Sequence, residues 1–130
     1  MRAEFESGLL TAKSVIIADD MADARAVAAI FLGELGMTVY EAENGLEALN
    51  LCKDRAVDLI LLDVRMPKLS GKALISQIRA LHKSVPILAI TGDKSSVVDE
   101  TENLILDINA YLIKPYQPRQ LLTAITSLLA

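Results

Sequence analysis

Short runs of aliphatic residues recur along the chain, and most of them are followed directly by a polar side chain. The strongest run is Leu59–Leu62, which has Asp58 before it and Asp63 after it. A run with no polar position needs both faces covered, so it predicts a strand in the middle of a parallel sheet. Further runs predict strands over residues 14–18, 37–42, 86–90 and 110–113.

The segments between these runs carry apolar residues every three or four positions, as amphipathic helices do. They predict helices over residues 23–35, 46–53, 72–82 and 118–129. A fifth helix is expected to begin at Ser95 or Ser96 and to end near Leu106, with the weakest apolar pattern of the set. In the first helix, the apolar positions expected to form the helical face are Val27, Ile30, Phe31 and Leu35.

The alternation of strands and helices predicts an α/β fold in which helices cover both faces of a parallel sheet. We expect a flavodoxin-like, doubly wound (βα)5 three-layer sandwich over residues 14–130, with the strand order 2-1-3-4-5. Residues 37–42 are more mixed in polarity, which favours the edge of the sheet. Residues 1–13 lack a clear period and are expected to form a flexible lead-in.

Composition narrows the class of protein. A chain of 130 residues with 52% hydrophobic residues is expected to form one globular domain. The net charge of -4, without a basic cluster, argues against direct nucleic-acid binding. No apolar run approaches the roughly 20 residues of a membrane span, and the start does not resemble a secretory signal. The single Cys52 cannot form an internal disulfide, so we expect a cytoplasmic protein.

Polar residues follow four of the predicted strands: Asp19–Asp20, Asp63, Thr91 and Lys114. Because the carboxyl ends of parallel strands share one edge of a sheet, these side chains are expected to meet. Three clustered carboxylates repel one another by on the order of a few kcal/mol per close pair, and a divalent cation offsets that repulsion. Oxygen ligands without a neighbouring His or Cys favour Mg²⁺, or Mn²⁺, over Zn²⁺.

This group of side chains suits phosphoryl transfer. An aspartate is ionised at neutral pH and can attack phosphorus to form an aspartyl phosphate without a general base. A metal and a lysine can neutralise charge on the transferring group, and a threonine hydroxyl can donate a hydrogen bond to it.

Taken together, the motifs resemble the signature of the response-regulator receiver domain of two-component signalling, over about residues 14–129. The matching residues are Asp19–Asp20, Asp63 with Met66–Pro67 and Gly71, Thr91, and Tyr111 with Lys114–Pro115. The resemblance implies that Asp63 is the phosphoacceptor and that the donor is a sensor histidine kinase or a histidine phosphotransfer protein. It further implies that Asp20, Asp63 and the backbone carbonyl of Arg65 bind the metal directly, and that Asp19 binds it through water.

The resemblance also implies how the domain switches. Thr91 and Lys114 would contact the phosphoryl group, Tyr111 would turn inward, and the Lys114–Pro115 bond would be cis. The surface formed by residues 95–108, the fifth strand and the last helix would change and act on a partner or output domain. Such a domain is a signalling switch and not a turnover enzyme, and it acts as a monomer or a phosphorylation-dependent dimer.

Two neighbours of the site carry a separate hypothesis. Arg65 and Asp93 lie two residues after the acceptor and the threonine, where opposite charges can pair across the site and hinder an attacking water. We expect both to lengthen the lifetime of the phosphorylated state.

Other interpretations stay open at this stage. A pseudo-receiver would bind proteins without being phosphorylated, although the full set of site residues argues against it. A phosphatase with an aspartyl-phosphate intermediate is disfavoured, since Arg65 stands where such enzymes have a second acid. Taken singly, Asp19–Asp20 can serve as a helix cap and Thr91 as a strand-end turn, and His82 is expected to be solvated at a helix end.

Overall fold

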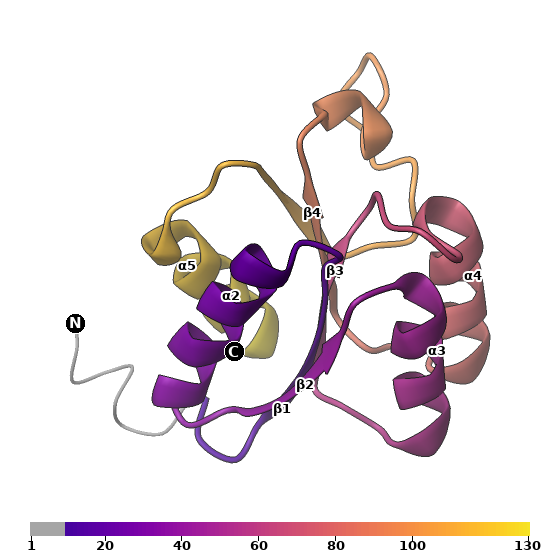
Figure 1. Cartoon of the computed structure of the whole chain (residues 1–130). Helices are drawn as coiled ribbons and strands as arrows, with labels where there is room; N and C mark the ends of the chain where they lie inside the picture. Colours follow the sequence, from indigo (N-terminus) through magenta and orange to yellow (C-terminus); the bar gives the residue numbers. More distant parts are fainter. Residues whose placement is uncertain (1–9) are drawn as a thin grey trace.

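The sheet has the predicted strands and the predicted order. The computed structural model describes residues 10–130. All strands pair in parallel, in the order β2-β1-β3-β4-β5 (Figure 1), which confirms the expected fold and puts residues 37–42 at an edge. The strands are β1 (Ser14–Ala18), β2 (Thr38–Ala42), β3 (Leu59–Asp63), β4 (Ile87–Thr91) and β5 (Ala110–Ile113).

Helices cover both faces of this sheet. Within residues 10–130 the α-helices are α2 (Ala22–Glu34), α3 (Gly45–Asp54), α4 (Gly71–Leu81) and α5 (Pro118–Leu129). Figure 1 shows α2 and α5 on one side of the sheet and α3 and α4 on the other. Successive residues of a strand point to opposite faces, so Ile60 packs with α3 and α4 whereas Leu61 packs with α2 and α5.

The expected lead-in lies mostly outside the described residues. Its described part begins at Leu10, which is fully buried in the core beneath α2 and α5. Ala12 donates a backbone hydrogen bond to the Gly36 carbonyl, so this part of the chain is joined to the turn after α2.

The face of α2 that packs on the sheet differs from the prediction. Ala28 and Leu32 are buried there, whereas Val27 and Ile30 are 65% and 64% exposed. Phe31 and Leu35 pack only partly against the core. The helix is rich in alanine, and a small buried Ala28 lets it approach the sheet closely, so the larger side chains beside it were a misleading guide to the face.

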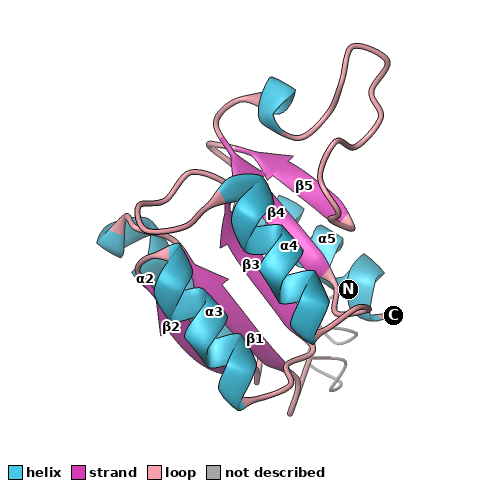
Figure 2. Ribbon diagram, turned by 90° about the vertical axis from the view of Figure 1, so that its right-hand side faces the viewer, coloured by secondary structure: helices cyan, strands magenta, loops and turns pink. Residues whose placement is uncertain are grey.

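The predicted helix from residue 95 to 106 was wrong. A single 3-10 turn, η2 (Lys94–Ser96), is followed by a hairpin over residues 97–105, in which Val98 and Leu104 form an antiparallel bridge. Figures 1 and 2 both show this segment extending beyond the sheet. Val97 and Val98 are both buried, and the chain after them doubles back so that the Ile105 N–H donates to the Val97 carbonyl at 2.8 Å.

The side chain of Asp99 explains the tip of this hairpin. Its Oδ1 accepts hydrogen bonds from the backbone N–H groups of Thr101 and Asn103, both at 2.9 Å. Such local side-chain bonds offer the backbone an alternative to the helical pattern. The hairpin is therefore stabilised from within.

One further finding concerns membranes. Over residues 10–130, the helices are all too short or too polar to cross a bilayer.

Candidate functional site

The structure brings three acids together at the carboxyl edge of the sheet. Asp19 and Asp20 follow β1 and Asp63 ends β3, and one carboxylate oxygen of each lies within 4.8 Å of the others. Asp19 and Asp63 are buried, whereas Asp20 is exposed. Lys114, which follows β5, completes the group: its Nζ donates to Asp63 Oδ2 at 2.6 Å and lies 3.7 Å from Asp19 Oδ2.

Backbone groups orient the two buried acids. The Met21 N–H donates to Asp19 Oδ1 at 2.9 Å, and the Arg65 N–H donates to Asp63 Oδ1 at 3.0 Å. One oxygen of each carboxylate is thus held by the loop that follows its strand, and the other faces Lys114. Lys114 is itself placed by its N–H bond to the Thr91 carbonyl, and the Lys114–Pro115 bond is cis, as expected.

The charges of the site respond to this arrangement. Burial raises the pKa of Asp19, and this outweighs the hydrogen bond from Met21 and the nearby Lys114 charge, which act to lower it. Burial acts to lower the pKa of Lys114, but the hydrogen bond and charge of Asp63, with the charges of Asp19 and Asp20, raise it above its ordinary value. The ammonium is therefore retained over a wide pH range.

The donor set fits a divalent cation. Three carboxylates face one ammonium, so two negative charges of the group are not compensated. The ligand atoms are all oxygens, as hard cations such as Mg²⁺ prefer. Within residues 10–130, no hydrogen bond holds the Asp20 side chain, so its oxygens are available as ligands.

The hydroxyl of Thr91 is bound to the backbone of the turn that follows β4. Thr91 is buried, its Oγ1 accepts from the Asp93 N–H at 3.0 Å, and it donates to the Asp93 carbonyl. The strand-end turn that its sequence position allows is thus formed. Tyr111 is half-buried and packs against the core shared with α3 and α4.

Arg65 and Asp93 do not form the ion pair expected of them. Both are exposed, and Asp93 instead caps η2 by accepting from the Ser95 N–H at 3.0 Å and the Ser95 hydroxyl at 2.8 Å. The hydrogen bonds from Ser95 are the main cause of the lowered pKa of Asp93, and the Arg65 charge adds to it. Asp93 thus forms local hydrogen bonds with Ser95 in place of an ion pair with Arg65.

The loop after Asp63 has a conformation that its sequence signals only in part. Pro67 and Gly71 were expected to turn the chain, and Gly71 has a φ of 57°. Lys68 and Leu69 also have positive φ values, 53° and 79°. The start of α3 lies against this loop at Gly45, whose N–H donates to the Pro67 carbonyl at 3.4 Å.

His82 was expected to be solvated, but it is half-buried. Its Nε2 donates to the Cys52 carbonyl, at 2.7 Å, so it links the end of α4 to α3. Neither His82 nor Cys52 reaches the acidic site, which lies at the other end of the sheet.

A groove that sequence patterns did not reveal adjoins the acids. It has a volume of about 580 Å³ and runs from Asp19 and Lys114 to Val27, Phe31 and Tyr116, between α2 and the segment that enters α5. Burial raises the pKa of Tyr116, and the nearby Asp19 charge adds to this. The sequence carried no clear signal for this groove, since Val27 and Phe31 were assigned to the apolar face of the helix and their position beside the acids follows only from the fold.

Comparisons with known proteins agree with this geometry. Residues 15–126 match the family described as "Response regulator receiver domain". The "Probable transcriptional regulator ycf27" of Cyanidium caldarium is 38% identical over 115 residues, which is 88% of this chain and 45% of that protein. The "Sensor histidine kinase CheAY" of Helicobacter pylori is 34% identical over 85% of this chain and 14% of its own length. The chain thus spans about half or less of the curated relatives it matches.

Solved structures agree on the fold. The receiver domain of sensor histidine kinase PA1611 from Pseudomonas aeruginosa PAO1, described "with magnesium ion coordinated in the active site cleft", has a TM-score of 0.80 and 26% identity. That match covers 92% of this chain and 98% of the other. The chemotaxis protein CheY4 of Vibrio cholerae has a TM-score of 0.79 and 26% identity, over 91% and 99% of the two chains. This chain belongs to the response regulator receiver domain family of two-component signalling.

Proposed function

We propose that this chain is a phosphorylation-dependent signalling switch of the cytoplasm, in which Asp63 accepts a phosphoryl group from a histidine kinase or a histidine phosphotransfer protein. The observation that supports this most is the site itself. Asp63 is buried beside Lys114, at 2.6 Å, and its carboxylate lies close enough to those of Asp19 and Asp20 for the three acids to share a cation.

The two oxygens of Asp63 have different tasks in this proposal. Oδ1 is held by the Arg65 N–H, so Oδ2 is the atom placed for attack. As the Oδ2–phosphorus bond forms, the bond from phosphorus to the donor histidine nitrogen breaks, and its electron pair stays with the histidine. Lys114 then moves its hydrogen bond from Oδ2 to an oxygen of the phosphoryl group.

Asp19, Asp20 and Asp63, with the Arg65 backbone carbonyl, would hold Mg²⁺ or Mn²⁺. When bound, this cation supplies positive charge to the phosphoryl oxygens. The buried Asp19 keeps Lys114 near the site through its charge, so the ammonium remains in place when Asp63 is modified.

The response begins at Thr91. To donate a hydrogen bond to the new phosphoryl oxygens, its hydroxyl must leave the Asp93 backbone, which it contacts now. That exchange would loosen the turn before η2 and allow Tyr111 to move inward. Changing a switch from mostly inactive to mostly active takes roughly 5.5 kcal/mol of differential interaction. Residues 93–106, β5 and α5 would then present a different surface to a downstream protein, to a second copy or to an output domain.

The phosphodonor is proposed to dock on α2. Met21, Val27 and Ile30 are 58%, 65% and 64% exposed on or beside this helix, and Met21 and Val27 line the groove that opens at Asp19 and Lys114. An apolar partner surface seated there would bring its phosphohistidine next to Asp63. We expect Val27→Ser to slow phosphoryl transfer from a protein donor and to leave the reaction with a small phosphodonor unchanged.

The chemistry is tested with a small phosphodonor and Mg²⁺, followed by mass spectrometry of the intact protein. We expect one phosphoryl group to be added to the wild type and to Asp54→Ala, in which an exposed acid at the end of α3 is removed. Asp63→Ala should gain none. An adduct that persists in Asp63→Ala, or a wild type that gains no adduct, would contradict the proposal.

We also propose that Arg65 and Asp93 slow the loss of the phosphoryl group by restricting water at the mouth of the site. Both are exposed beside Asp63 and Thr91. Arg65→Ala and Asp93→Ala should therefore shorten the phosphorylated lifetime, and equal decay rates in wild type and variants would rule this out.

A further inference from the structure

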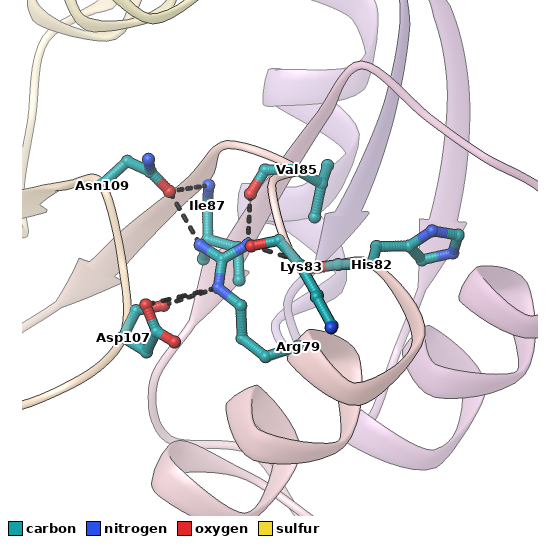
Figure 3. A network of polar contacts seen from close by, with 7 residues as sticks. All are labelled: Arg79, His82, Lys83, Val85, Ile87, Asp107 and Asn109. Carbon is teal, nitrogen blue, oxygen red and sulfur yellow. Dashed lines mark hydrogen bonds and ion pairs between the residues drawn. The ribbon is translucent and has the colours of Figure 1, made fainter.

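Arg79 joins the end of α4 and the loop that follows it to residues 107–109, which are distant in sequence. It lies in the last turn of α4, and its side chain is only 12% exposed. Figure 3 shows its guanidinium between the loop after α4 and the segment before β5. Its Nη1 donates to the Val85 carbonyl at 2.6 Å, its Nε to the Asp107 carbonyl at 3.1 Å, and its Nη2 to Asn109 Oδ1 at 2.9 Å.

The same contacts fix the start of β5 against the start of β4. Asn109 Oδ1 also accepts from the Ile87 N–H at 2.9 Å, and the Asn109 N–H donates back to the Ile87 carbonyl at 2.9 Å. Asp107 adds an ion pair, with its Oδ1 3.5 Å from Arg79 Nε. Because the planar guanidinium spreads its donors over several directions, one side chain serves all of these acceptors.

This clamp lies at one end of the hairpin, and the phosphorylation site lies at the other. Upstream, residues 93–96 follow Thr91, whose hydroxyl holds the Asp93 backbone. Downstream, the chain runs from Ile105 into residues 107–109. Between these ends the hairpin is linked by its own hydrogen bonds, such as Ile105 N–H to the Val97 carbonyl at 2.8 Å, so it is suited to move as one unit.

We propose that Arg79 is a positioning residue that fixes residues 107–109, so that the hairpin pivots about this point when Thr91 responds to a phosphoryl group on Asp63. The inference rests on the proposed function. It adds that the backbone of residues 107–109 stays in place, so that the start of β5 serves as the fixed end of the moving hairpin.

Amide NMR of the full chain with Mg²⁺, with and without beryllofluoride as a phosphoryl mimic, tests the pivot. In the wild type we expect the amide signals of residues 93–105 to shift and those of Ile87 and Asn109 to stay in place. In Arg79→Lys, which keeps the charge but loses the fork of donors, the Ile87 and Asn109 signals should also shift. Without beryllofluoride, their hydrogen exchange in this variant should be roughly tenfold faster or more.

Arg119→Lys is the matched control, since Arg119 is exposed on α5 and its side chain makes no hydrogen bond within residues 10–130. It should behave as the wild type. The proposal is overturned if the wild-type Asn109 signal moves as much as those of the hairpin, or if Arg79→Lys leaves its exchange unchanged. If beryllofluoride does not shift Asp63 and Thr91, the proposed function fails and the pivot with it, while the exchange rates still decide whether Arg79 fixes Asn109.

Discussion

Two glycines at helix positions should respond to the same substitution in opposite directions. Gly33 lies near the end of α2, and Gly45 is the first residue of α3. A Cβ on Gly33 would meet nothing within 4 Å, whereas a Cβ on Gly45 would lie 1.5 Å from the Leu69 carbonyl oxygen. We therefore expect Gly33→Ala to stabilise the protein and Gly45→Ala to destabilise it.

The magnitudes follow from these contacts. Replacing an unhindered helical glycine with alanine gains up to about 0.5–1 kcal/mol. At Gly45 the obstacle is backbone and cannot rotate away, and overpacking of this kind costs about 1–3 kcal/mol. The loop has little freedom to yield, because Lys68 and Leu69 already have left-handed φ values, which cost a non-glycine residue roughly 1–2 kcal/mol each. The two variants should thus differ by about 1.5–4 kcal/mol.

Urea unfolding followed by circular dichroism measures this difference. With a slope of about 2 kcal/mol per M urea for a domain of this size, the two midpoints should lie roughly 0.75–2 M apart. The wild-type midpoint should fall between them. Equal midpoints for the two variants would show that α3 and the loop after Asp63 can separate without cost, and would refute the argument from close approach.

Three further predictions concern charges and the single thiol. Asp20→Asn should raise the unfolding free energy in EDTA by up to about 1 kcal/mol, because it relieves repulsion in a partly exposed acid cluster. The same variant should lose most of the stabilisation that Mg²⁺ gives the wild type, and a thermal shift with Mg²⁺ equal to that of the wild type would contradict this. Cys52 is buried, and burial raises its pKa to about 11. A thiol reagent at neutral pH should therefore label it at the unfolding rate, and rapid labelling of the native protein would contradict this prediction. The hydrogen bonds from Asn103 and then Thr101 lower the pKa of Asp99. The stabilisation that ionised Asp99 gives the hairpin is therefore complete above the ordinary aspartate pKa of about 3.9, and it is lost as the pH falls through the lower pKa that Asp99 has in the folded protein. The protection of the Asn103 amide, taken relative to its intrinsic exchange rate at each pH, should fall over that range in the wild type but not in Asp99→Asn.

The parts of the fold that the sequence predicted well are those decided by adjacent residues. The run Leu59–Leu62 is buried on both faces because no position in it tolerates water, so its place inside the sheet follows from composition alone. The acids after β1 and β3 meet Lys114 because parallel strands end at one edge, whatever the details of packing. Local pattern and topology together therefore place these side chains without knowledge of any single contact.

The face of α2 could not be predicted in this way. Alanines stand on several sides of the helix, so hydrophobicity does not distinguish the face that packs from the face that is exposed. The choice is made by fit, since the small Ala28 allows close approach to the sheet and Val27 is left to line the groove beside the acids. The wrongly predicted face therefore belongs to α2, the helix for which we propose a binding role and which carries apolar residues outside the core.

The hairpin over residues 97–105 depends on contacts still more distant in sequence. Ser95 or Ser96 can cap a helix locally. The chain instead doubles back through the Val98–Leu104 bridge, and Asp107 and Asn109 are bound by Arg79 from α4. A helix over residues 95–106 rises about 1.5 Å per residue, whereas an extended chain rises about 3.3 Å. The hairpin therefore projects from the sheet between two anchored ends, one held by Thr91 in the present state and one held by Arg79. If the hydroxyl of Thr91 exchanges its partner as proposed, the hairpin should turn as one unit about the clamp, because its two strands are joined by hydrogen bonds. The largest displacement is then expected at its exposed tip.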